Sequence, residues 1–135
     1  MSTSRILVSS GTDFESTVGY SRAVRVGPHI AVAGTTGPGM PGDAGAQTRE
    51  ALRRIGIALN EAGAALTDVI RTRIFVTDIS RWREVAAAHA EVFGQIRPAA
   101  TMVEVAALIA PELVVEIEAD AYSAIAANVP SADGG

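Results

Sequence analysis

The stretch VVEIEADAY, residues 114–122, alternates apolar and acidic side chains from Val115 to Ala121. A period of two is typical of a β-strand with one buried face, because successive side chains point to opposite sides of a sheet. The apolar set is Val115, Ile117, Ala119 and Ala121. The acidic set is Glu116, Glu118 and Asp120. Side chains on one face lie roughly 7 Å apart, so three carboxylates in a row repel unless they meet water or cations. The pattern predicts a sheet with one apolar face and one charged face.

A second alternating stretch, VIRTRIFV at residues 69–76, offers cations at the same step of two. If the two strands are neighbours, Arg71 and Arg73 interleave with the carboxylates of the acidic strand. A charged face of this kind either meets solvent or forms a polar contact between subunits. Because it also carries apolar positions, we expect it to lie between the subunits of a symmetric homo-oligomer.

Two segments have the three- and four-residue spacing of amphipathic helices. The first would bury Ala51, Leu52, Ile55, Leu59 and Ala62, and would stop at Gly63. The second would begin at an N-cap at Ser80 and end before Pro98. Its expected buried stripe comprises Trp82, Val85, Ala86, His89, Val92 and Phe93.

The remaining strands are short. Gly27-Pro28 indicates a turn between two hairpin strands, one around Val24 and Val26 with Arg22 and Arg25 as the polar set. A Gly/Pro-rich loop, TTGPGMPGDAG, follows as either a flexible connection or a ligand-facing lip. Strands are also expected at 101–108 and 114–122, with an optional N-terminal strand at 6–8. The order ββαβαββ predicts an α+β fold: a mixed sheet with two helices packed on one face.

At 135 residues, the chain predicts a single domain over 1–123 with a flexible tail over 124–135. Its net charge of −4 argues against nucleic acid as a partner. No apolar run has the length of a membrane span, and the first residues do not have the pattern of a signal peptide. The chain has no cysteine, so a cytoplasmic location is the expectation. Its two histidines, His29 and His89, lie far apart and make a poor metal set.

Several segments, in order, resemble the Rid proteins (reactive intermediate deaminases), also called the YjgF or endoribonuclease L-PSP family. GYSRAVRVG is similar to that family's Pro-Tyr-Ser-Gln-Ala segment, and IAVAGTTGP to its strand ending in Ser-Gly-Gln. VIRTRIFVTDIS and PAATMVEVAAL…VVEIEA resemble its later strands. The resemblance implies a chorismate-mutase-like fold, a homotrimer and small-molecule clefts between subunits. It also implies hydrolysis of 2-imino acids, or their enamine tautomers, to keto acids and ammonia without a metal or organic cofactor.

That reaction needs a cation for the substrate carboxylate and a group that passes protons to and from a water. By resemblance, Glu116 matches the proton-handling glutamate. The implied ligand-cleft positions are Tyr20, Gly34, Thr35, Ala100, Thr101 and Met102. Thr35 stands where the family has Gln, and Ala100 stands where it has the carboxylate-binding Arg.

Loss of a bidentate Arg–carboxylate contact costs about 3–5 kcal/mol, a hundred- to several-thousand-fold in efficiency. Arg97 is three residues earlier and points to the opposite face of an extended chain. A further alternative is that Arg22 or Arg71 of a neighbouring subunit supplies the carboxylate-binding cation. A standard 2-iminobutanoate deaminase is therefore not expected.

Two hypotheses remain. The first is a divergent hydrolase acting on an imine or similar small metabolite, with Glu116 as its catalytic group. The second is a non-catalytic trimer that binds a metabolite, or serves regulation, through the same clefts. Nuclease activity, suggested by the family's older label, conflicts with the acidic balance and the lack of a metal cluster, and chorismate mutase activity would need several arginines. His89 is expected to pack in the core, and Trp82 in the core or at a subunit contact.

Overall fold

The computed structural model describes residues 4–124, which build one six-stranded sheet with three α-helices. In chain order the elements are β1 (Arg5–Val8), α1 (Asp13–Val18), β2 (Ala23–Val26), β3 (His29–Thr36), α2 (Ala44–Glu61), β4 (Val69–Val76), α3 (Trp82–Phe93), β5 (Ala99–Glu104) and β6 (Val115–Tyr122). The predicted α+β class is confirmed. The optional N-terminal strand is present as β1.

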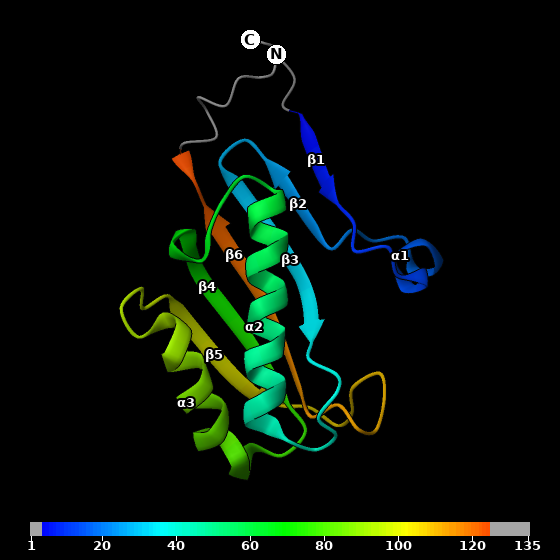
Figure 1. The fold of residues 1–135 in the computed structure, drawn as a ribbon, viewed down its shortest axis with the longest axis vertical. Coiled ribbons are helices and arrows are strands. Elements are labelled where there is room, and N and C mark those ends of the chain that lie inside the picture. Colours follow the sequence, from blue (N-terminus) through cyan, green and yellow to red (C-terminus); the bar gives the residue numbers. More distant parts are fainter. Residues whose placement is uncertain (1–3, 125–135) are drawn as a thin grey trace.

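The last strand lies in the middle of the sheet. The spatial order is β1-β2-β3-β6-β4-β5, with β6 antiparallel to both β3 and β4 and with β5 parallel to β4. Figure 1 shows α2 and α3 side by side over one face of this sheet, as the sequence predicts. The opposite face has no helix over it within the described residues. The acidic side of β6 therefore lies at the centre of an uncovered face.

The alternation in β6 separates a buried apolar face from a partly exposed acidic face, as predicted. Val115, Ile117, Ala119 and Ala121 are at most 1% exposed on the helix-covered face, whereas the three carboxylates on the other face are partly exposed. The predicted stripe of α2 is also buried: Ala51, Leu52, Ile55 and Leu59 lie against the sheet and Ala62 lies just beyond the helix end. Burial of these apolar faces, at about 25 cal/mol per Å², drives the helices onto the sheet.

Both ends of α2 are fixed by local chemistry. Asp43 accepts a hydrogen bond from the Ala46 N–H at 2.9 Å, which satisfies one free donor of the first turn. Gly63 follows the helix with a positive φ of 81°, the conformation that ends helices at glycine. The stop predicted at Gly63 is confirmed.

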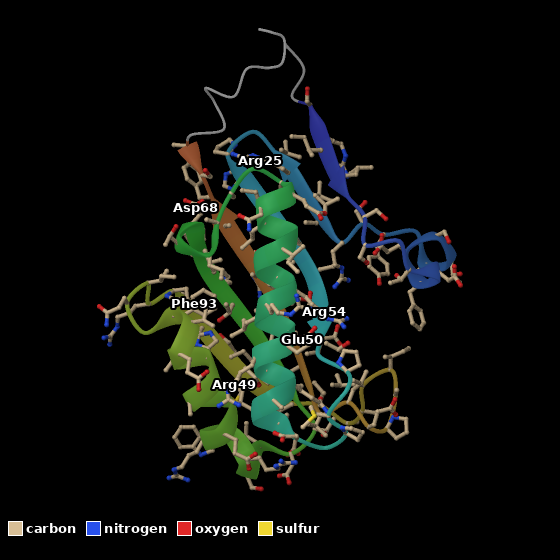
Figure 2. All side chains as sticks on the ribbon, in the orientation of Figure 1. Arg25, Arg49, Glu50, Arg54, Asp68 and Phe93 are labelled. Carbon is tan, nitrogen blue, oxygen red and sulfur yellow. The ribbon has the colours of Figure 1, made fainter. Side chains whose placement is uncertain are left out.

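Arg25 corrects the expected alternation of β2. The sequence puts it on the polar face, but it is 2% exposed and lies on the helix-covered side with Ala23. Its guanidinium donates to the carbonyl oxygens of Gly27, Ala62 and Ser123 at 2.9, 2.6 and 2.9 Å. Figure 2 shows Arg25 at the C-terminal end of α2. The negative end of the helix dipole and free carbonyl oxygens hold the cation there.

Three further boundaries differ from expectation. Helix α1 was not predicted, because six residues are too few to show a helical period. Strand β5 spans Ala99–Glu104 rather than 101–108, so residues 105–108 leave the sheet. Asp78, not Ser80, caps the start of the second helical segment: its carboxylate accepts from the Ser80 N–H at 3.0 Å, and a short 3₁₀ turn precedes α3.

Trp82 does not reach the core of the chain. It begins α3, is 43% exposed, and stacks under the guanidinium of Arg83 at 4.6 Å. Val85 and Phe93 of the same predicted stripe are buried. Among residues 4–124, no helix has both the length and the apolar character needed to cross a bilayer. Apart from Ala124, the predicted C-terminal tail lies outside the described residues.

Candidate functional site

Glu116 is the carboxylate of β6 that lies opposite an apolar residue of β4. Across the β4–β6 pairing, Asp120 lies opposite Arg71 and Glu118 opposite Arg73, whereas Glu116 lies opposite Phe75. An apolar neighbour removes water from a carboxylate without supplying a charge. Burial accordingly raises the pKa of Glu116; the charge of Arg22 opposes this rise and that of Glu118 adds to it.

The other two carboxylates of β6, Glu118 and Asp120, share one arginine of β4. Arg73 Nη1 lies 3.4 Å from Glu118 Oε1 and 3.0 Å from Asp120 Oδ2, which confirms the predicted pairing for Arg73. Arg71 lies opposite Asp120 but forms no ion pair within residues 4–124, so the prediction for Arg71 is not confirmed. The side chains of Arg73, Glu118 and Asp120 are about 40% exposed, so each pair contributes less than about 1 kcal/mol. Within residues 4–124, Glu116 is the β6 carboxylate that forms no ion pair.

Gly34 lies directly against the Glu116 carboxylate. The β3–β6 register shifts between Val32 and Thr35, and this bulge places the Gly34 backbone next to the glutamate side chain. A Cβ built on Gly34 would stand 3.0 Å from Glu116 Cδ and closer still to Oε2. Glycine is required here so that the carboxylate can lie flat against the strand.

Arg22, immediately before β2, provides the cation nearest to this arrangement. Its Nη1 donates to the carbonyl oxygen of Gly34 at 3.0 Å and to Thr35 Oγ1 at 2.8 Å. The ring of Tyr20 lies 5.6 Å from the guanidinium carbon, within the range of a cation–π contact. Sequence reasoning considered Arg22 from a neighbouring subunit and missed its place in the same chain. The available signal is its spacing of two from Tyr20, which puts both side chains on one side of an extended segment.

Thr35 contacts Arg22 from the helix-covered side of the sheet. It is 1% exposed and pairs with Ile117 on the helix-covered side, so it does not line an open surface. Its hydroxyl donates to the Ala33 carbonyl oxygen at 2.7 Å and accepts from Arg22. Thr35 therefore fixes the position of the arginine.

The structure separates the predicted β5 positions from Glu116 within one chain. Parallel pairing places Ala100 beside Thr72 and Met102 beside Ile74, which puts both on the helix-covered side. Met102 packs against the hydrophobic core. Thr101 pairs with Arg73 and so lies on the same face as Glu116, two strands away. The structure thus places Gly34 against Glu116, and Tyr20 and Thr35 contact Arg22, which is bound to Gly34. Ala100 and Met102 lie on the other side of the sheet, and their predicted cleft role would require a second subunit.

A shallow hollow of about 550 Å³ lies on the uncovered face beside these residues. Its lining includes Tyr20, Ser21, Ala31 and Ala33 together with the charged side chains of Arg5, Glu118 and Asp120. A second hollow of about 370 Å³ lies where the Gly/Pro-rich loop meets α2. Its arginines, Arg49 and Arg53, are engaged by Glu91 and Glu50 at 2.9 and 2.8 Å, and Figure 2 shows Glu50 beside Arg54 on α2. The hollow on the uncovered face, which is lined by Tyr20 of the predicted set, is therefore the better candidate site.

The histidines have packing contacts. His89 Nε2 lies 3.0 Å from Thr72 Oγ1, its ring packs on Phe93, and burial lowers its pKa. His29 meets the edge of Tyr122 with ring centroids 5.1 Å apart. In the described part of the chain, no group of three or more His, Asp or Glu side chains is arranged to hold a metal ion.

Comparison with known proteins adds independent information. The family model described as Endoribonuclease L-PSP matches residues 10–123. A crystal structure of a Mycobacterium tuberculosis member of the YjgF/YER057c/UK114 family is 70% identical, covers 88% of this chain and 99% of that one, and superposes with a TM-score of 0.86. A RutC family protein of Pyrococcus abyssi is 36% identical over 109 residues, 76% of this chain and 85% of its own length. The 3-aminoacrylate deaminase RutC of Acinetobacter baylyi is 38% identical over 81 residues, 60% of this chain and 64% of its own length.

Proposed function

The chain belongs to the endoribonuclease L-PSP family, also called YjgF or Rid, and we propose that it hydrolyses the imine or enamine form of a small metabolite. The proposed products are a carbonyl compound and ammonia. The proposed assembly is a homotrimer, with a small-molecule site beside each Glu116 in a cleft between subunits. No metal or organic cofactor is needed for this chemistry.

The carboxylate of Glu116 carries the proposal. A group with a raised pKa both accepts and returns a proton near neutral pH more readily than an ordinary glutamate. Glu116 takes a proton from a water as the water oxygen adds to the imine carbon. It passes this proton to the imine nitrogen, which gives a carbinolamine. Glu116 then takes the proton of the carbinolamine hydroxyl group and gives it to the same nitrogen as the carbon–nitrogen bond breaks and ammonia leaves. The water oxygen stays on the carbon as the new carbonyl oxygen, so atoms and charges balance.

The relatives support this reaction class. One similar protein is a 3-aminoacrylate deaminase, which by its name acts on the enamine of a small carboxylic acid. The shared segment is short, so it supports the class of reaction rather than the identity of the substrate.

Ala100 argues for a changed mode of substrate recognition. The family resemblance places an arginine here, and a methyl group offers no hydrogen bond to a carboxylate. In the chain itself, Ala100 lies beside Thr72 on the side of the sheet opposite to Glu116. We therefore propose that this protein is not a standard 2-iminobutanoate deaminase and that a different group orients its substrate.

The test is release of ammonia above the spontaneous rate from a panel of imines generated in situ by amino acid and amine oxidases. Glu116→Gln should lower this rate by about 10²–10⁴-fold, the usual contribution of a general acid–base group. Glu61→Gln, the same change at an exposed residue at the end of α2, should leave the rate unchanged. Equal rates for the native protein and Glu116→Gln across the panel would reject the proposed hydrolase.

A non-catalytic trimer that binds a metabolite is the second candidate function. The observation in its favour is Ala100 together with the hollow lined by Tyr20 and Glu118, which provides space without an arginine at the family's carboxylate-binding position. Native mass spectrometry of protein taken directly from cells should then show a retained small molecule, released by unfolding. A thermal shift with a metabolite, in the absence of any ammonia release, would favour this function over hydrolysis.

A further inference from the structure

We propose that Gln47 of α2 is a positioning residue for Glu116: it fixes the two strand ends at which Glu116 lies and so holds its carboxylate against Gly34. The kinetic part of this inference rests on the hydrolase proposed above. Its structural part, the place of the carboxylate, does not.

Gln47 is a buried polar residue whose side-chain hydrogen bonds, within residues 4–124, all go to backbone groups outside α2. It is 1% exposed, and its Nε2 donates to the carbonyl oxygens of Met40 and Glu112 at 2.9 and 2.8 Å. Its Oε1 accepts from the Val114 N–H at 2.8 Å. Because a buried amide is costly to leave unpaired, these three bonds hold their partners in one arrangement. Gln47 thereby ties α2 to the Gly/Pro-rich loop and to the segment that leads into β6.

The bond to Val114 lies just outside the end of the sheet at which Glu116 is placed. Strand β6 begins directly after Val114, and Glu116 pairs with Thr36, the last residue of β3. The pairing of the strands ends close to Glu116, and the ends of such ladders open most easily. Gln47 extends the bonding beyond the ladder, together with the Thr77 N–H, which donates to the Val114 carbonyl oxygen at 3.1 Å. The backbone two residues before Glu116 is therefore fixed at both of its polar groups.

The end of β3 contacts the backbone of the same residue. Gly37 follows Thr36, and a Cβ built on Gly37 would overlap with the Gln47 carbonyl oxygen and stand 2.9 Å from the Ala51 nitrogen. Only a residue without a side chain lets the chain approach α2 this closely. Figure 1 shows the loop that leads into β6 beside the N-terminal end of α2. Gln47 therefore contacts the chain on both sides of the Thr36–Glu116 pair.

This placement affects the Glu116 side chain, because Gly34 lies two residues before Thr36 and contacts the carboxylate at the β3 bulge. A shift of the Thr36–Glu116 pair would move the carboxylate away from Gly34 and toward water. Burial raises the pKa of Glu116, so a carboxylate that reaches water should have a lower pKa. A shift of roughly 1 Å in a catalytic group lowers its rate about 100-fold. Gln47 should therefore affect both the titration of Glu116 and a reaction that uses it.

The decisive experiment follows the side-chain carboxyl carbon of Glu116 by NMR as the pH is changed. Gln47→Met keeps the length of the side chain and removes all three hydrogen bonds, so the pKa of Glu116 should fall toward its ordinary value of 4.5. Thr48→Val is the matched control: Thr48 is the next residue of α2, is fully buried, and donates to the Ala44 carbonyl oxygen of the same helix at 2.8 Å. Both variants should lower the midpoint of urea unfolding, but Thr48→Val should leave the pKa of Glu116 unchanged.

Kinetics separate this inference from the proposed function. In a protein that releases ammonia, Gln47→Met should lower kcat about 10- to 100-fold and leave KM nearly unchanged, because the substrate contacts stay in place. In the Glu116→Gln background it should cause no further loss, since both changes act on the same group. A purely structural role of Gln47 would lower the rate equally in both backgrounds. If the native protein hydrolyses no imine, the hydrolase is rejected and the pKa of Glu116 alone decides the role of Gln47.

Gln47→Asn keeps the test valid if Gln47→Met does not fold. It retains a neutral amide and leaves fewer buried groups unpaired, but it is one methylene shorter and cannot make all three bonds at once. The pKa of Glu116 should then fall by a smaller amount. The inference is overturned if the folded variant keeps the native pKa of Glu116, if Thr48→Val lowers this pKa equally, or if Gln47→Met lowers the rate equally with and without Glu116.

Discussion

The carboxylate of Glu116 occupies the space that a side chain on Gly34 would fill. Oε2 would overlap with a Cβ built on residue 34, and Cδ is 3.0 Å from the position of that Cβ. The bulge in β3 makes this contact, since it shifts the register between Val32 and Thr35. The glycine thus determines where the proposed proton-handling group lies.

Gly34→Ala should therefore impair activity more than stability. The colliding atom is the far end of a flexible side chain, so Glu116 can rotate away and the free energy of unfolding should change by less than about 1 kcal/mol. The displaced carboxylate should lower the rate of ammonia release about 100-fold, since a shift of roughly 1 Å in a catalytic group has that effect.

Gly45→Ala in α2 is the matched control for this change. A Cβ at Gly45 would lie at least 3.6 Å from its neighbours, an ordinary contact. The variant should keep the native rate and gain about 0.4–1 kcal/mol from the reduced entropy of the unfolded chain. Full activity of Gly34→Ala would show that the position of Glu116 against the strand has no role in the reaction.

Glu116→Gln should stabilise the protein at neutral pH. Because burial raises the folded-state pKa above the ordinary value of 4.5, the folded state binds the proton more tightly than the unfolded state does. The resulting stability is complete below the unfolded pKa and is lost as pH rises through the folded pKa. Glutamine carries no charge and avoids this loss, so the difference in unfolding free energy should favour Glu116→Gln at pH 7 and shrink toward pH 3.

Urea denaturation at several pH values measures this effect. Glu118→Gln is the comparison, since it removes an ion pair with Arg73 and should not stabilise the protein at pH 7. A native protein as stable as Glu116→Gln at every pH would contradict a strained, partly buried carboxylate.

Arg25 should contribute strongly to stability. It is almost completely buried and donates to three carbonyl oxygens, including that of Ala62 at the end of α2. Arg25→Met leaves these oxygens without a donor and should cost about 2–4 kcal/mol in unfolding free energy. Arg53→Met removes an exposed arginine paired with Glu50 and should cost less than about 1 kcal/mol. Chemical denaturation distinguishes the two, and equal losses would contradict the capping role of Arg25.

The contrast between β6 and Arg25 shows what local pattern can predict. The alternation of β6 and the apolar stripe of α2 are properties of contiguous residues, so the sequence predicts them correctly. The face of Arg25 depends on the carbonyl oxygens of Ala62 and Ser123, which are distant in sequence. A charged residue in a strand is ordinarily placed on the solvent side, and only the packed fold reveals acceptors on the other.

The candidate site also contains some residues that the sequence predicts and others that only the fold reveals. Glu116 follows from the alternation together with the family resemblance, and its neighbour Phe75 follows from strand pairing. The approach of Arg22 to Gly34 depends on a register shift that has no signature in the local sequence. The face on which Ala100 lies depends on its pairing with Thr72, whereas the expected strand start at Thr101 leaves Ala100 outside the strand.

The uncovered face of the sheet should be buried between copies of the chain. Val103 of β5 is 42% exposed there and lies beside Phe75, in the same cross-strand row as Glu116. An apolar side chain and partly neutralised charges on one face favour a polar subunit contact over open solvent. Native mass spectrometry should therefore give three times the 13.9 kDa of one chain.

Val103→Arg should shift this assembly toward single chains, because a buried guanidinium without a partner costs several kcal/mol at each of the symmetry-related contacts. Ile57→Arg is the control: Ile57 is a 44% exposed apolar residue on α2, on the helix-covered side of the sheet. It should leave the mass unchanged. A native protein that stays at the mass of one chain at micromolar concentration, or an Ile57→Arg variant that dissociates as fully as Val103→Arg, would contradict burial of the uncovered face.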